Sequence, residues 1–193
     1  LETSLTAGDI ACLQLRLKNA EGRIDEAATR AVSEAVTPMA QSYDVAVLIN
    51  DSPDLAVDLG ADGVHVGWDD ISVKKAREII GKDMILGATA KNSRHMAMLA
   101  GEAGADYVAF GAFYPTETKA GTVAAEPDLL TIWQEIMEIP CVAIGGITLD
   151  NAEPLVTAGA DFLAVSSGVW NHAEGAPVAV AAFNALLDRL SAH

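Results

Sequence analysis

Short apolar runs alternate along the chain with longer segments whose apolar residues recur at helical spacing. The runs predict seven strands, near residues 10–16, 45–50, 63–67, 84–89, 106–111, 141–145 and 161–166. The segments predict helices near residues 25–41, 53–59, 72–80, 93–103, 127–138, 150–158 and 176–191. Strands that alternate with helices are typical of a parallel sheet covered by helices.

The turn sequence Gly-Ala-Asp occurs three times, at 60–62, 104–106 and 159–161, each time between a predicted helix and a predicted strand. Glycine can close a helix in the left-handed conformation, and the polar residue then turns the chain into the next strand. Ala7-Gly8-Asp9 is a weaker fourth copy. The helix after residue 52 is expected to begin at an N-cap Ser52 followed by Pro53, and the helix after residue 92 at an N-cap Asn92.

Seven strands are one fewer than a (β/α)₈ TIM barrel contains. Residues 1–7 predict the end of a helix, so we expect the first strand and the start of its helix to precede residue 1. An open doubly wound sheet is the alternative. Because the strand runs look uniformly buried, whereas a wound sheet usually has polar edge strands, the pattern favours the barrel. A length of 193 residues, 51% of them hydrophobic, suits a single domain over 1–193.

The formal charge of −15 excludes a nucleic-acid surface, where basic residues must meet phosphates. No apolar stretch approaches the roughly 20 residues of a membrane span, and no signal peptide opens the chain. Cys12 and Cys141 each lie inside an apolar run, which predicts buried, reduced thiols in a cytoplasmic protein.

The stretch LQLRLK at 13–18 places Gln14, Arg16 and Lys18 at every second position. Alternate residues of a strand share one face. Two cations and an amide on one face suit an anion with several oxygens, such as a phosphate. A solvated edge strand is the alternative interpretation.

Most other polar clusters also lie at or just beyond the C-terminal ends of predicted strands, where barrel enzymes build their active sites. Gly145-Gly146 and the later Ser166-Ser167-Gly168 are expected to expose backbone N–H groups to phosphate oxygens. A glycine pair that only relieves crowding in a turn is the alternative. Convergence of these clusters on one rim is the main prediction from the pattern.

Asp51 and Asp70 follow neighbouring predicted strands, so their carboxylates are expected to lie close together. Two carboxylates beside a phosphate site suit Mg²⁺, which takes one or two carboxylates together with waters and substrate oxygens. Helix N-capping is the alternative, and we assign that role to Asp69. The loop 113–122 adds Thr116, Thr118 and Lys119, which could close over a polyphosphate; a plain solvated loop is the alternative.

Taken together, QLRLK, LINDSPDLAVDLGADGVHVGWDD, PTETK, IPCVAIGGIT and FLAVSSGVW resemble the thiamine-phosphate synthase family, in order and across essentially the whole chain. The resemblance implies a (β/α)₈ barrel and a transferase. Enzymes of this family join a hydroxymethylpyrimidine diphosphate to a thiazole phosphate with Mg²⁺, forming thiamine phosphate and releasing pyrophosphate, and the resemblance implies the same reaction here. The expected partners are these small molecules, while the sequence leaves homo-oligomer formation open.

The resemblance also implies a role for each matching residue. The pyrimidine diphosphate would be held by Gln14, Arg16, Lys18 and Asn50, with Thr89 near the pyrophosphate in place of the family's usual Ser. Mg²⁺ would be bound by Asp51 and Asp70. The thiazole substrate would be met by Thr116 and Thr118, and its phosphate by Gly146 and the backbone of Ser166 and Ser167. Arg16, Lys18 and Lys119 are the catalytic candidates, because cations stabilise charge on a leaving pyrophosphate.

Two departures from the family pattern bear on the activity. Trp68 replaces the usual Gln before the second acidic pair, and Lys91 stands where related thiazole tautomerases rely on a His. A thiazole tautomerase on the same barrel is one alternative, which Lys91 and the pair of carboxylates disfavour. A phosphosugar isomerase or epimerase and a non-catalytic barrel that binds a phosphorylated ligand are the others.

Overall fold

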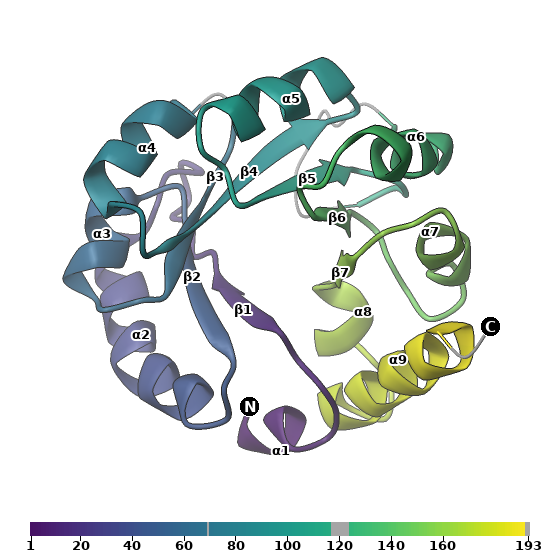
Figure 1. The fold of residues 1–193 in the computed structure, drawn as a ribbon. Coiled ribbons are helices and arrows are strands. Elements are labelled where there is room, and N and C mark those ends of the chain that lie inside the picture. The colour runs from purple at the N-terminus through teal and green to yellow at the C-terminus, as the bar shows by residue number, and fades with distance from the viewer. Residues whose placement is uncertain (69, 117–123, 192–193) are drawn as a thin grey trace.

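Seven parallel strands form the inner layer of the computed structural model, and the helices surround them (Figure 1). The structure describes residues 1–68, 70–116 and 124–191. The strands are β1 (Cys12–Leu15), β2 (Ala46–Asn50), β3 (Gly63–Val66), β4 (Ile85–Lys91), β5 (Tyr107–Gly111), β6 (Cys141–Ile144) and β7 (Phe162–Ala164). The helices are α1 (Glu2–Leu5), α2 (Glu26–Gln41), α3 (Pro53–Asp58), α4 (Val73–Ile80), α5 (Arg94–Glu102), α6 (Asp128–Ile136), α7 (Glu153–Thr157), α8 (Ser167–Trp170) and α9 (Ala176–Ser191).

Each strand pairs in parallel with the next, so the spatial order runs from β1 to β7 without a reversal. A doubly wound sheet reverses its order at a switch point, and this order excludes it. The predicted closed (β/α)₈ barrel is shown only in part, however. Within the described residues β1 and β7 do not pair with each other, and the strands form an open, curved sheet. An eighth strand is not found among these residues, because the sequence pattern supplies only seven strand runs.

The predicted helix starts are confirmed at one position and wrong at another. The Ser52 side chain accepts the N–H of Leu55, with Pro53 at the first helical position of α3. The N-cap of α5 is Ser93, whose side chain accepts the N–H of Met96, and not the expected Asn92. Lys91 adopts a positive φ of 53°, so the chain turns as it leaves β4 and the helix begins one residue later.

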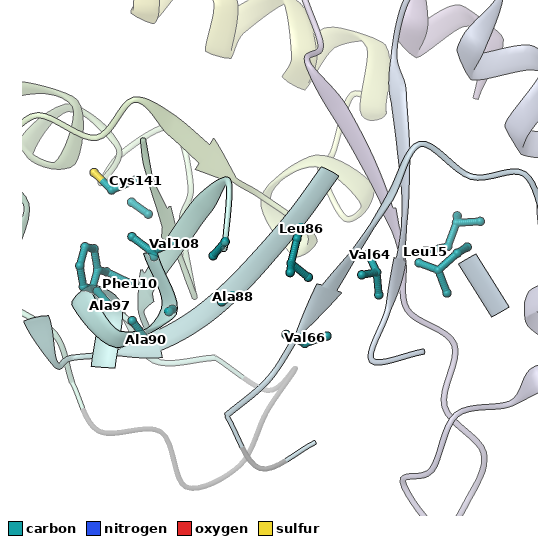
Figure 2. Close-up of a cluster of buried hydrophobic side chains, with 14 of the residues drawn as sticks. Leu15, Val64, Val66, Leu86, Ala88, Ala90, Ala97, Val108, Phe110 and Cys141 are labelled. Carbon is teal, nitrogen blue, oxygen red and sulfur yellow. The ribbon is translucent and has the colours of Figure 1, made fainter. Parts of the chain in front are cut away.

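Side chains on the outer face of the sheet pack beneath the helices and form the core (Figure 2). The rings of Phe110 on β5 and Trp133 on α6 meet edge to face, with centroids 5.3 Å apart. Cys141 is buried and free, as expected, but Cys12 is exposed, because β1 is an edge strand. No helix in the described part of the chain is both long and apolar enough to cross a membrane.

The three Gly-Ala-Asp turns fasten neighbouring strands together, which the sequence pattern alone did not predict. In each turn the aspartate precedes one strand and accepts a backbone N–H at the start of the strand before it. The pairs are Asp62 with Val47 (2.7 Å), Asp106 with Leu86 (2.7 Å) and Asp161 with Cys141 (2.8 Å). The turn glycines have positive φ values of 62°, 100° and 103°, as predicted for residues that close helices.

Each of these turns closes one helix and is bound by a side chain from the helix before that one. Gln41, Arg77 and Gln134 each donate to the turn glycine's carbonyl and to the aspartate carboxylate. The weaker copy at Gly8-Asp9 is also bound by a helix side chain, Asn184 of α9, but this residue accepts the Asp9 N–H and donates to the Asp9 carbonyl. The carboxylate of Asp9 has no partner in the described part of the chain. Within the described residues the fourth turn therefore lacks both the strand N–H and the side-chain donor that the other three aspartate carboxylates have.

Candidate active site

The C-terminal ends of all seven strands lie at one rim of the sheet, because the strands are parallel and adjacent. This arrangement confirms the predicted convergence for the strand-end residues that the structure describes. Gln14 lies on β1, Asn50 ends β2, and Thr89 lies near the end of β4. Asp51, Asp70 and Gly146 follow β2, β3 and β6.

Residues at and just beyond the ends of β1 and β2 contact one another at this rim. The Gln14 side-chain amide donates to Asn50 Oδ1 at 2.6 Å, and Asn50 is buried. Lys18 Nζ forms an ion pair with Asp51 Oδ2, and both side chains are largely shielded from solvent. Arg16 is exposed and makes no ion pair or hydrogen bond with any described residue. Its guanidinium is therefore available to an anion.

The carboxylates of Asp51 and Asp70 lie close enough to influence one another. Partial burial, with the nearby Asp51 carboxylate second, raises the pKa of Asp70, while Lys18 acts in the opposite direction. The Gly67 N–H also donates to Asp70 Oδ2 at 3.1 Å. Among the described residues there is no group of three or more acidic, His or Cys ligands. Two carboxylates fit Mg²⁺, which completes its shell with waters and substrate oxygens, and their mutual repulsion favours a cation between them.

A polar row crosses the inner face of the sheet just below the rim. His65, Gly87 and Tyr107 are in register on β3, β4 and β5. A Cβ on Gly87 would lie 2.0 Å from the Tyr107 ring, so the missing side chain is what lets Tyr107 reach across β4. His65 Nδ1 then lies 2.8 Å from Tyr107 Oη, and His65 Nε2 lies 2.8 Å from Thr89 Oγ1.

His65 is buried, and sequence reasoning missed both its contact with Tyr107 and Tyr107 itself. A glycine inside a strand was the available signal, because it often marks a close approach of another group. Here that group is the Tyr107 ring.

The loops after β6 and β7 lie side by side. A Cβ on Gly168 would lie 2.5 Å from the Ile147 carbonyl oxygen, and one on Gly146 would lie 2.4 Å from the Pro115 carbonyl oxygen. Crowding therefore accounts for part of the glycine requirement, together with a φ of 65° at Gly146. The N–H groups of Gly146 and Ser167 donate to no acceptor in the described part of the chain. Such N–H groups can bind phosphate oxygens.

The predicted residues of the loop 113–122, Asp69 and Trp68 differ in how far the structure describes them. Thr116 is partly buried at the end of a described segment, whereas Thr118 and Lys119 lie outside the described residues, as does Asp69. Trp68 is 46% exposed. It lines a pocket of about 200 Å³ together with Ile71, Val73 of α4 and Leu99 of α5. That pocket lies beside the rim, between β3 and the helices.

Known proteins resemble this chain over nearly its whole length. A profile of the thiamine monophosphate synthase family matches residues 1–169. Thiamine-phosphate synthase of Hyphomonas neptunium is 66% identical over 191 residues, 99% of this chain and 86% of the relative. That of Rhodospirillum centenum is 58% identical over 187 residues, 97% of this chain and 88% of the relative.

A solved structure agrees with these relatives. Thiamine phosphate pyrophosphorylase from Pyrococcus furiosus superposes with a TM-score of 0.84 at 30% identity, over 98% of this chain and 88% of that one. Among the activities that the sequence left open, the synthase is the one these proteins carry in their names. The chain therefore belongs to the thiamine monophosphate synthase family and acts as a transferase in the synthesis of thiamine phosphate.

Proposed function

We propose that the enzyme binds Mg²⁺ through Asp51 and Asp70, and that it transfers a hydroxymethylpyrimidine group from its diphosphate to the nitrogen of a thiazole phosphate. The observation that carries the proposal is the meeting of Lys18, Asp51 and Asp70 at one rim. When bound, Mg²⁺ would neutralise charge on the diphosphate oxygens.

The cations of the rim would stabilise the leaving group. Arg16 offers a guanidinium that pairs with none of the residues the structure describes, and Lys18 is already held beside Asp51. Lys119 is expected to join them from the loop 113–122. Negative charge develops on pyrophosphate as the carbon–oxygen bond breaks, so positive groups fixed in advance lower the barrier. Thr89 would meet the same diphosphate through its hydroxyl. Gln14 and Asn50 would hold the remainder of the substrate through their amides.

The reaction needs no nucleophile from the protein. The pyrimidine methylene loses pyrophosphate, which leaves with the bonding electron pair, and the thiazole nitrogen then supplies the pair for the new carbon–nitrogen bond. The electron-rich aminopyrimidine can stabilise a positive methylene, which makes a dissociative path the reasonable one. The protein's task is to align the two substrates and to keep their charges compensated.

The thiazole phosphate would bind at the loops after β6 and β7. The N–H groups of Gly146 and Ser167 are unpaired within the described residues, and Ser166 adjoins them. The contact between Gly168 and Ile147 keeps the two loops together. Thr116 and Thr118 would contact the thiazole ring from the neighbouring loop.

We also propose that an eighth strand closes the barrel between β7 and β1. The support is the unpaired edge of each strand and the turn at Asp9, whose carboxylate matches those that accept a strand N–H elsewhere. Slow amide exchange at the outer edges of β1 and β7, in the protein as the cell makes it, is the expected result. Fast exchange at both edges would contradict closure.

We place the reaction in the cytoplasm. Both cysteines are free thiols, and free thiols persist where the compartment is reducing. Cell fractionation tests this placement.

Pyrophosphate release tests the main proposal. Release is expected only with both substrates and Mg²⁺, and chelation should abolish it. The Asp70→Ala variant should lose turnover by about 100-fold or more while still binding thiazole phosphate, which calorimetry measures separately. Full activity after chelation, or equal loss of turnover and thiazole phosphate binding in Asp70→Ala, would overturn the metal role.

A further inference from the structure

Three side chains on the inner face of the sheet form a continuous hydrogen-bonded chain that ends at the rim. Tyr107 Oη lies 2.8 Å from His65 Nδ1, and His65 Nε2 lies 2.8 Å from Thr89 Oγ1. His65 is 5% exposed, and its ring lies 5.6 Å from the Tyr107 ring, centroid to centroid. His65 and Tyr107 are both in register with Gly87, and Thr89 lies two residues further along β4 toward its C-terminal end. The chain therefore runs along the inner face of the sheet toward the proposed diphosphate site.

The hydroxyl of Tyr107 fixes the direction of these hydrogen bonds. Burial, with Cys12 nearby, raises the pKa of Tyr107, so the phenol keeps its proton. Its only hydrogen-bond partner in the described part of the chain is His65 Nδ1. A shielded O–H group requires an acceptor, and a neutral imidazole has one accepting and one donating nitrogen. His65 Nδ1 is thus the acceptor, and its Nε2 carries the hydrogen.

The consequence reaches Thr89. Because His65 Nε2–H donates to Thr89 Oγ1, the threonine's own hydrogen cannot be used on the histidine. That hydrogen is free to point toward the rim. A substrate diphosphate offers only acceptor oxygens there, and a hydroxyl that must donate suits it better than one that can turn either way.

We propose that Tyr107 and His65 are positioning residues that orient the hydroxyl hydrogen of Thr89 toward the diphosphate of the pyrimidine substrate. The inference rests on the role proposed above for Thr89. It explains why β4 carries a glycine at position 87, since any side chain there would displace Tyr107 from His65.

Nitrogen NMR of protein labelled with ¹⁵N-histidine tests the hydrogen assignment without any substrate. The His65 signals are identified by their loss in His65→Gln. We expect Nε2 to show the shift of a protonated nitrogen and Nδ1 that of an unprotonated acceptor, and the pattern to change in Tyr107→Phe. The opposite tautomer in the unmodified protein would overturn the proposal, whatever Thr89 binds.

Kinetics tests the consequence for the substrate. Tyr107→Phe should raise the KM for the pyrimidine diphosphate by about 5- to 10-fold, as expected for one neutral hydrogen bond, and leave the KM for thiazole phosphate unchanged. Thr89→Val should raise it by about 10- to 100-fold, because the bond is to a charged group, and Thr89→Ser should restore it. Tyr43→Phe is the matched control, since Tyr43 is a surface tyrosine bonded to Glu2.

A double variant distinguishes failure of the proposed positioning by Tyr107 and His65 from failure of the role proposed for Thr89. In the Thr89→Val background, Tyr107→Phe should have no further effect on the diphosphate KM. Additive effects on this KM would overturn the positioning of Thr89 by Tyr107 and His65, while leaving the role of Thr89 itself intact. An unchanged diphosphate KM in Thr89→Val would instead refute the proposed role of Thr89, and with it the functional part of this inference.

Discussion

The ammonium group of Lys18 is paired with the carboxylate of Asp51, the residue expected to bind Mg²⁺. Under the proposed function, a lysine and a metal ion would therefore share one carboxylate at the rim. Because like charges repel, Lys18 would weaken the binding of a cation to the free enzyme. Once a diphosphate is bound, its negative charge would attract both Lys18 and the metal ion, and the two positive charges would then be compensated.

Lys18→Gln is accordingly expected to have opposite effects on two ligands. Mg²⁺ alone should bind the variant about 3- to 10-fold more tightly, because a nearby positive charge is gone. The pyrimidine diphosphate should bind more weakly by about 10-fold or more, because one charge-assisted contact is lost. Calorimetric titration of each ligand separately measures both changes.

Lys75→Gln is the matched control, since Lys75 pairs with Glu78 on the surface at 3.2 Å. This control should leave both affinities unchanged, because exposed ion pairs contribute little. Weaker Mg²⁺ binding by Lys18→Gln would show that Lys18 does not compete with the metal for Asp51.

An aspartate of a Gly-Ala-Asp turn should stabilise the protein where its carboxylate accepts a strand N–H, and should contribute little where it accepts none. Asp161→Ala leaves the Cys141 N–H without its 2.8 Å partner, so we expect the free energy of unfolding to fall by about 1–3 kcal/mol. Asp9→Ala is the control within the same turn type, and its effect should stay within about 0.5 kcal/mol in residues 1–193. Urea denaturation measures both.

The same pair of variants tests closure of the barrel. If an eighth strand is present between β7 and β1, Asp9 gains an N–H to accept, and Asp9→Ala should then destabilise the protein as much as Asp161→Ala does. A chain that carries the additional strand yet tolerates Asp9→Ala would contradict the proposed equivalence of the four turns.

The sequence predicted the succession of strands and helices well, because apolar periodicity and turn glycines are local signals. The turn at 159–161 was found as a helix end, for example. That Asp161 reaches back to Cys141 was not predicted, since this contact depends on the register of β6 beside β7.

The site shows the same division between local and long-range information. Asp51 and Asp70 were expected to be neighbours from the order of their strands. Tyr107 and its contact with His65 were missed, because only the pairing of three strands brings them together across Gly87. The exposure of Cys12 was also missed, because an apolar run does not reveal whether its strand lies at an edge.

Gly146→Ala should impair the proposed thiazole phosphate site more than strain alone explains. The new Cβ would lie 2.4 Å from the Pro115 carbonyl oxygen, so the loops after β5 and β6 must separate. We expect the KM for thiazole phosphate to rise by about 10-fold or more, the size of a lost charge-assisted hydrogen bond, with a smaller change for the diphosphate.

Gly22→Ala isolates the contribution of the backbone. Gly22 has a similar φ of 75°, but a Cβ there would meet no atom within 4 Å. It should cost about 1–2 kcal/mol of stability from left-handed strain alone, with both KM values unchanged. If the two alanine variants have the same kinetics, the close approach at Gly146 has no role in substrate binding.

The buried thiol of Cys141 should make the protein less stable at alkaline pH. Burial raises its pKa from 9.0 to about 11. Below pH 9 both the folded and the unfolded states hold the proton, so this group gives no pH dependence. As the pH rises above 9, the unfolded state loses the proton first, and stability falls until the folded thiol also ionises.

The total loss from this group is on the order of 2–3 kcal/mol, at about 1.4 kcal/mol for each unit of pKa difference. Urea denaturation between about pH 7 and pH 10.5 measures the larger part of it, because the loss continues until the pH passes the folded pKa. Cys141→Ala should start from a lower stability, because it leaves a cavity, but should lose less of that stability as the pH rises. Stability curves that run parallel for the two proteins would show that another group, and not the Cys141 thiol, controls alkaline unfolding.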